Sequence, residues 1–169
     1  PISNHLNEWV HISATYSYNS GNMKIYFNGQ LSGTANIGSI LSNSGTDDLY
    51  IGRYRITEVS SESFKGCIDD IRVYNREITE TEVQQLYSEN GWESINQGLI
   101  ADYPFSGNAS DLSGNNYHGT ENNVTLTSDR FGNSNKAFSF DGTSSNILLP
   151  YSILFNQNAF STSCWFKPT

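Results

Sequence analysis

Four aspartates are the side chains of this sequence best suited to holding a metal ion. Asp69 and Asp70 are adjacent in CIDDIRV, Asp111 lies in NASDLSGNN, and Asp141 lies in FDG. Calcium takes about six to eight oxygen ligands from carboxylates and backbone carbonyls in irregular loops. We expect Asp111 and Asp141 to form the preferred pair in a calcium site. The alternative is that each carboxylate is structural and binds no metal.

The structural alternative needs partners for the adjacent carboxylates. Successive side chains of a strand point to opposite faces, so at most one of Asp69 and Asp70 should face the sheet interior. A buried carboxylate must be paired or hydrogen-bonded. The partner would be Arg72, Arg130, or a row of backbone N–H groups in the loop 108–119.

No constellation of this sequence predicts catalysis. Hydrolysis of a glycosidic bond needs two carboxylates roughly 5–10 Å apart. The acid-rich stretches EVSSES and TETE lie in a predicted loop and at a predicted helix start, which do not hold such a pair. The three histidines, His5, His11 and His118, have no serine or cysteine elbow beside them. We therefore expect a protein that is not an enzyme.

Aromatic and polar side chains favour ligand binding instead. Sugars are held by flat aromatic rings that stack on the pyranose face and by polar groups that reach the hydroxyls. Arg53 and Tyr54 follow the stretch DLYIG at the start of a predicted long loop, and Trp92 and Tyr117 lie in polar segments. These four residues are candidate ligand-binding residues. The alternative for the tyrosines is half-buried packing, which is common in β-rich proteins.

Composition favours strands joined by turns. The chain has 169 residues, with 36% hydrophobic, 13% aromatic and 15% charged residues, which suits one domain or two small ones. A net charge of −8 with nine scattered Lys and Arg leaves no basic stripe for nucleic acid. The longest apolar run is too short to span a membrane. Cys67 and Cys164 fit no metal spacing, and they are either buried thiols or one disulfide.

Periodicity places the expected strands and the one helix. Residues 9–16 alternate apolar with polar, and Asn28-Gly29 between two alternating runs predicts a tight hairpin turn. Trp9 and Trp165 are expected in the core. Thr79 and Glu82 have the spacing of a capping box, which predicts a short helix over 79–88. Further strands are expected within 48–53, 67–74, 99–105, 136–150 and 160–167.

The same strings resemble a known domain. One set resembles the C-terminal half of the laminin-G-like, concanavalin-A-like jelly roll, whose architecture pentraxins share: NEWVHISATYS, MKIYFNGQLSG, DLYIGR and FKGCIDDIRVYNREITETEVQQLY. Another set resembles its N-terminal half: GLIADYPFSGNASDLSGNNYHGT, DRFGNSNKAFSFDGTSSNILLP and FSTSCWFKP. The resemblance implies an all-β fold, a two-sheet antiparallel jelly-roll sandwich with one short helix.

The two halves stand in reverse order relative to that family. The resemblance places a C-terminal half over residues 1–89, a linker over 90–98 and an N-terminal half over 99–169. We expect the two halves to form one permuted sandwich, because a half sandwich exposes an apolar face and open strand edges. The alternatives are completion between chains by strand exchange and a segment cut from tandem repeats.

The resemblance also implies function. Similar domains often hold calcium where the N-terminal strands meet the last strand, so the aspartates named above are expected to converge there. Glycosidases of this fold carry alternating acidic residues on one strand, and no stretch here has that pattern. We expect a noncatalytic module of a larger secreted or cell-surface protein that binds a glycan or a cell-surface protein in adhesion. The alternatives are a structural spacer or stalk repeat, and an accessory module of a polysaccharide-degrading enzyme.

Overall fold

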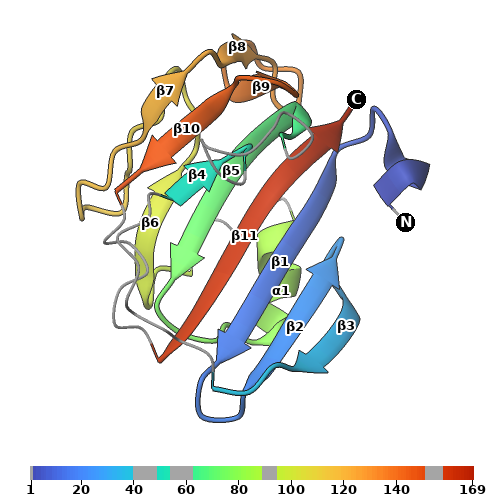
Figure 1. Cartoon of the computed structure of the whole chain (residues 1–169), viewed down its shortest axis with the longest axis vertical. Helices are drawn as coiled ribbons and strands as arrows, with labels where there is room; N and C mark the ends of the chain where they lie inside the picture. The colour runs from blue at the N-terminus through green and yellow to red at the C-terminus, as the bar shows by residue number, and fades with distance from the viewer. Residues whose placement is uncertain (1, 40–48, 54–62, 89–94, 151–157) are drawn as a thin grey trace.

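The computed structural model describes residues 2–39, 49–53, 63–88, 95–150 and 158–169 (Figure 1). A short 3-10 helix, η1 (Ile2–His5), precedes the first strand, and α1 (Glu80–Tyr87) is an α-helix. The strands are β1 (Val10–Ser17), β2 (Asn22–Phe27), β3 (Gln30–Asn36), β4 (Leu49–Ile51), β5 (Lys65–Tyr74), β6 (Leu99–Tyr103), β7 (Thr120–Asn122), β8 (Thr125–Thr127), β9 (Ala137–Asp141), β10 (Asn146–Leu149) and β11 (Ala159–Pro168).

Two antiparallel sheets make up the sandwich, which confirms the all-β prediction. The larger sheet has eight strands in the order β3-β2-β1-β11-β5-β9-β8, and β6 pairs with β5. The smaller sheet has three strands in the order β4-β10-β7. β11, the last strand of the chain, lies between β1 and β5, so strands from both ends of the chain share one sheet (Figure 1).

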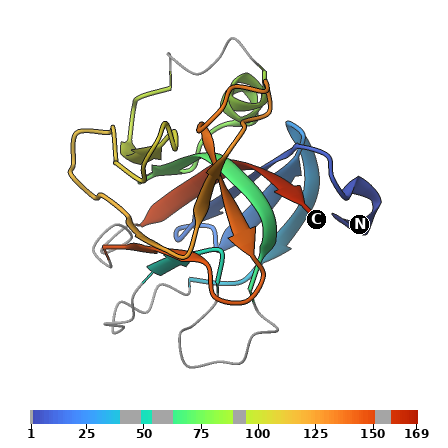
Figure 2. The same ribbon diagram turned by 90° about the horizontal axis from the view of Figure 1, so that it is seen from above.

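The two faces of the larger sheet differ because the side chains of each strand alternate. Val10 and Ile12 of β1 face the smaller sheet and belong to the apolar core between the sheets, whereas His11 lies on the opposite face. Figure 2 shows the smaller sheet and α1 on opposite sides of the larger sheet. A second buried cluster, which includes Val83 and Leu86, lies beneath α1.

The hairpin and the helix cap have the local geometry that the sequence predicts. Asn28 and Gly29, between β2 and β3, have φ angles of 47° and 75°. The Thr79 side chain accepts a hydrogen bond from the Glu82 backbone N–H, and Glu82 reaches back to the Thr79 backbone, which completes the capping box. Both predictions are confirmed.

The stretch 106–135 holds two short strands that the sequence did not predict. β7 and β8 have three residues each, and their side chains are mostly exposed. Such strands carry no apolar alternation, so nothing in their sequence separates them from a loop. They matter here because the segment between β8 and β9 reaches over the helix side of the larger sheet.

Candidate functional site

A cavity of about 380 Å³ opens on the helix side of the larger sheet. We call it the aromatic pocket, because four of the six residues that line it are aromatic. The lining residues are Trp9, Tyr87, Ser88, Arg130, Phe131 and Trp165.

Trp165 forms the floor of the aromatic pocket. It is paired with His11 of β1 on one side and with Asp69 of β5 on the other, so the three side chains form one row across the sheet. The Tyr87 ring, at the end of α1, stacks on Trp165 with ring centroids 5.6 Å apart and an angle of 21° between the planes. The helix therefore sets one wall of the pocket and the sheet sets its base.

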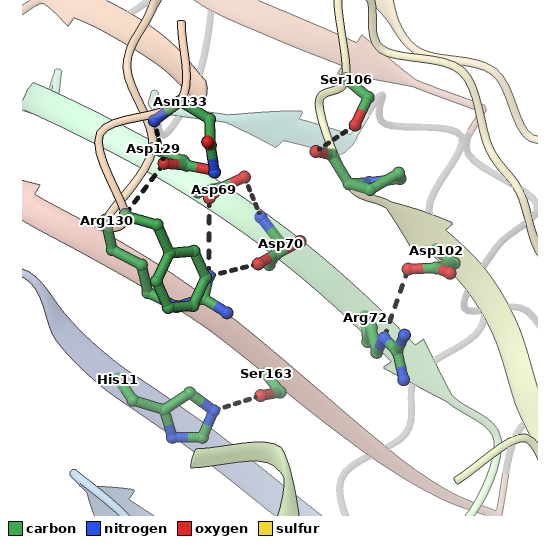
Figure 3. Close-up of polar contacts among 12 residues, drawn as sticks. His11, Asp69, Asp70, Arg72, Asp102, Ser106, Asp129, Arg130, Asn133 and Ser163 are labelled. Carbon is green, nitrogen blue, oxygen red and sulfur yellow. Dashed lines mark hydrogen bonds and ion pairs between the residues drawn. The ribbon is translucent and has the colours of Figure 1, made fainter. Parts of the chain in front are cut away.

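Arg130 and Phe131 form the opposite wall. The Arg130 guanidinium carbon lies 4.6 Å from the centre of the Trp165 ring and 4.3 Å from the centre of the Phe131 ring. A cation at such distances is attracted by the ring quadrupole. The loop is fixed by Asp129, whose carboxylate accepts hydrogen bonds from the backbone N–H groups of Phe131 and Asn133 (Figure 3).

Asp69 and Asp70 both contact Arg130, which corrects the expectation that they point to opposite faces. Arg130 Nη1 donates to Asp70 Oδ2 and lies 3.6 Å from Asp69 Oδ2 (Figure 3). The cause is an irregularity in β5: its register with β11 shifts at this point, and Asp70 has a φ of 51°. An extra residue in one strand interrupts the alternation and re-aims a side chain.

Burial governs the charge of this acidic pair. Desolvation and the neighbouring Asp70 carboxylate raise the pKa of Asp69 to about 8, against the opposing effect of Arg130. Desolvation also raises the pKa of Asp70, although its hydrogen bond with Arg130 works the other way. At neutral pH Asp69 therefore keeps its proton beside the Arg130 guanidinium.

His11 and Ser163 form a buried pair beneath the pocket. His11 Nε2 lies 2.8 Å from Ser163 Oγ, so the fold brings a serine that is 152 residues away in sequence beside this histidine (Figure 3). His11 is 0% exposed and Ser163 is 4% exposed. Burial and the nearby Arg130 charge lower the pKa of His11 to about 4, so the imidazole is neutral at physiological pH.

Asp111, a predicted calcium ligand, is held by the protein itself. Its carboxylate accepts hydrogen bonds from the backbone N–H groups of Asp102, Ser113 and Tyr117 at 2.9–3.0 Å. Burial opposes ionisation, but these bonds outweigh it and lower the pKa of Asp111. The sequence offered the N–H groups of this loop as partners for Asp69 or Asp70, and in the structure two of them bind Asp111 of the same loop.

Asp141, the other preferred calcium ligand, is held in the same way at the end of β9. Its carboxylate accepts hydrogen bonds from the backbone N–H groups of Thr143, Ser144 and Ser145, and these lower its pKa. Arg130 engages the other two predicted ligands, Asp69 and Asp70. Among the described residues no group of three or more His, Cys, Asp and Glu could hold a metal ion. Each of the four carboxylates is bound within the protein, and calcium binding stays a prediction.

The predicted ligand-binding residues do not gather at the aromatic pocket. Arg53 lines a separate cavity of about 600 Å³ at the start of β5. Tyr117 is half-buried against the core between the sheets. Tyr54 and Trp92 lie outside the described residues.

Sequence reasoning missed the pocket because its residues come from four separate segments. Trp165 is buried, as expected, but it lies on the helix side of the sheet and outside the core between the sheets. Trp9 is half-buried and lines the pocket. The one available signal was the alternation in β11, which puts Trp165 on the face opposite to Cys164 and Phe166.

Residues 1–84 match the family described as the concanavalin A-like lectin/glucanases superfamily. Residues 1–84 of this chain are therefore a region of the concanavalin A-like lectin/glucanase type. The match includes Trp9 and His11 but ends before Tyr87, so the aromatic pocket of this lectin/glucanase-type domain extends beyond the matched residues. No solved structure matches the chain at a significant level.

A curated relative is the botulinum neurotoxin type F of Clostridium botulinum. The two chains are 29% identical over 102 residues, which cover 60% of this chain and 8% of the toxin. The lectin/glucanase-type domain thus spans only a small part of that relative's length. Within the described residues no helix is long and apolar enough to cross a membrane.

Proposed function

We propose that this lectin/glucanase-type domain is a noncatalytic recognition module that binds carbohydrate in the aromatic pocket. The observation that carries the proposal is the set of aromatic rings around one cavity, of which Phe131 is 54% exposed and Tyr87 is 39% exposed. Exposed rings beside a cavity offer flat apolar surfaces on which a pyranose stacks. Ser88 and Arg130 supply polar groups for the hydroxyls at the same cavity.

The burial of the reactive groups supports a noncatalytic role. Ser163 lies under the pocket floor and cannot reach a bound substrate without movement of Trp165 or α1. His11 Nδ1 has no hydrogen-bond partner among the described residues, so the third member of a serine–histidine–acid arrangement is missing there. Asp69 and Asp70 are covered by Arg130, which removes them as a free pair of glycosidase carboxylates.

The domain acts, in this proposal, outside the cell as part of a larger protein. Laminin-G-like domains are typical of extracellular proteins, and the similar chain named above is a toxin. Its partner would be a glycan, either free or attached to a cell-surface protein.

A glycan array with matched variants tests the proposal. Phe131→Ala and Trp9→Ala are each expected to weaken binding about tenfold, which corresponds to the loss of one stacking contact. Leu112→Ala is the control, because Leu112 is 65% exposed and does not line the pocket. Equal binding by wild type and both aromatic variants would place the site elsewhere, and no binding by any of them would favour the spacer alternative.

A chelator arm on the same array tests the calcium prediction. No carboxylate lines the aromatic pocket, so binding there is expected to be unchanged by the removal of calcium. Binding that the chelator abolishes would move the site to Asp111 and Asp141.

A further inference from the structure

Lys167 lies at the edge of the aromatic pocket. It follows Trp165 by two residues in β11, so both side chains point to the helix side of the larger sheet. The Lys167 ammonium group lies 5.5 Å from the centre of the Trp9 ring, and Trp9 lines the pocket. A positive charge therefore lies over a ring that lines the pocket.

Three other cations on or beside the larger sheet are paired with carboxylates. Lys24 binds Glu77 at 2.7 Å and Arg76 binds Glu82 at 2.7 Å. Arg72 lies 3.3 Å from an Asp102 carboxylate oxygen. Lys167 forms no ion pair with any residue that the structure describes.

The remaining charges near the pocket are engaged within the protein. Arg130 is bound by Asp70 and lies 3.6 Å from Asp69, so its charge is engaged by carboxyl groups of β5. The Asp129 carboxylate is occupied by donors of its own loop, which include the Asn133 side-chain amide at 2.9 Å. Beside the pocket, Lys167 is a cation with no carboxylate partner among the described residues.

We propose that the aromatic pocket selects sugars that carry a carboxylate, and that Lys167 is the residue that recognises this group. The inference rests on the carbohydrate binding proposed above and names its substrate class. The sugar ring stacks on the exposed aromatic rings while its carboxylate accepts a charge-assisted hydrogen bond from the Lys167 ammonium. Uronic acids and sialic acids share this chemistry.

The experiment compares acidic sugars with uncharged partners that have the same ring. The probes are oligogalacturonides against their methyl esters, and a sialylated oligosaccharide against its desialylated parent. Binding to the wild-type chain is measured by calorimetry at about 50 mM and about 500 mM salt, because screening weakens an exposed charge contact. The variants are Lys167→Gln and the control Lys24→Gln, which changes the net charge equally but lies on β2 and binds Glu77.

The wild type is expected to bind one acidic probe at least tenfold more tightly than its uncharged partner. Lys167→Gln is expected to remove that preference and to leave binding of the uncharged probe unchanged, whereas Lys24→Gln keeps it. Equal binding of both partners that Phe131→Ala still weakens would overturn this inference and leave the proposed function intact. No binding of any sugar by the folded wild type would overturn both.

Discussion

Two sets of aspartates in this domain have pKa values that are shifted in opposite directions. Asp69 and Asp70 are buried on β5, and burial raises the pKa of both. Asp111 and Asp141 lie in loops whose backbone N–H groups bind them, and the pKa of both is lowered. The same side chain is therefore a costly buried charge at one place and a stabilising anion at the other, and the difference lies in the number and type of donors.

The donors also differ in their distance along the chain. Asp111 binds backbone groups that lie 2, 6 and 9 residues away. The Arg130 that binds Asp70 is 60 residues away. The loop aspartates are thus held by local structure, whereas the buried pair depends on the packing of the β8–β9 loop over the larger sheet.

The removal of Arg130 should have the largest effect on stability, because the buried pair depends on it. Arg130→Met leaves two buried carboxyl groups without their guanidinium partner, and we expect it to lower the free energy of unfolding by about 3–5 kcal/mol. Urea denaturation followed by fluorescence measures the change. Arg130→Lys keeps the charge but loses the planar stacking with Trp165, and we expect an intermediate loss. A change below about 1 kcal/mol for Arg130→Met would contradict the assignment of Arg130 as the essential partner.

The pH dependence of the free energy of unfolding should distinguish the buried aspartates from Asp111 and Asp141. Folded Asp69 keeps its proton up to about pH 8, whereas the unfolded chain releases it near pH 4. The folded state therefore binds more protons in this window, and the contribution of Asp69 to stability is lost as the pH rises through about 8. We expect a smaller effect than that of removing Arg130, because Arg130 stays in place to bind the ionised form.

Asp69→Asn is the matched variant for this measurement. It should remove the decline in the free energy of unfolding between about pH 4 and pH 8. The His11 imidazole, whose pKa is lowered to about 4, gives the opposite slope below about pH 6.5, and this slope cancels between wild type and variant. Parallel pH curves for the two proteins would show that Asp69 is ionised in the folded state.

Asp111→Asn tests the more buried of the loop aspartates. The amide keeps the shape of the carboxylate but loses the charge that strengthens its hydrogen bonds with backbone N–H groups. We expect a loss of about 1–3 kcal/mol in the free energy of unfolding at pH 7. The same variant should bind calcium no differently from wild type, and a calcium-dependent rise in melting temperature for wild type alone would restore the predicted metal site.

The features that the sequence could predict are likewise those that depend on local structure. The Asn28-Gly29 turn and the Thr79–Glu82 capping box are encoded by neighbouring residues, and both have the predicted geometry. The alternation of the long strands and the resemblance to a known domain gave the fold class. The donors of Asp111 also lie close by in sequence, but the N–H groups of its loop were expected to bind Asp69 or Asp70.

The aromatic pocket and the geometry of the acidic pair could not be predicted in this way, although Arg130 was among the partners expected for a buried carboxylate of that pair. The irregularity at Asp70 depends on how β5 pairs with β11, and the place of Arg130 depends on a loop between two strands that carry no apolar pattern. Trp9, Tyr87 and Trp165 come from different elements, and their meeting is a consequence of strand order. The residue pattern of one segment predicts which face of a strand a residue occupies. The neighbours of that residue on the face depend on the tertiary fold.

Asp141→Asn should give the smallest effect and completes the comparison. The carboxylate is exposed and binds only the turn that follows β9, so its loss should loosen that turn and lower stability less than Asp111→Asn. Since its pKa is lowered in the folded state, its stabilising contribution is present above about pH 4 and is lost as the pH falls further. Wild type and variant should therefore converge at acid pH, in the direction opposite to the Asp69 curves. A difference that persists in acid would mean that the turn depends on the shape of the side chain and not on its charge.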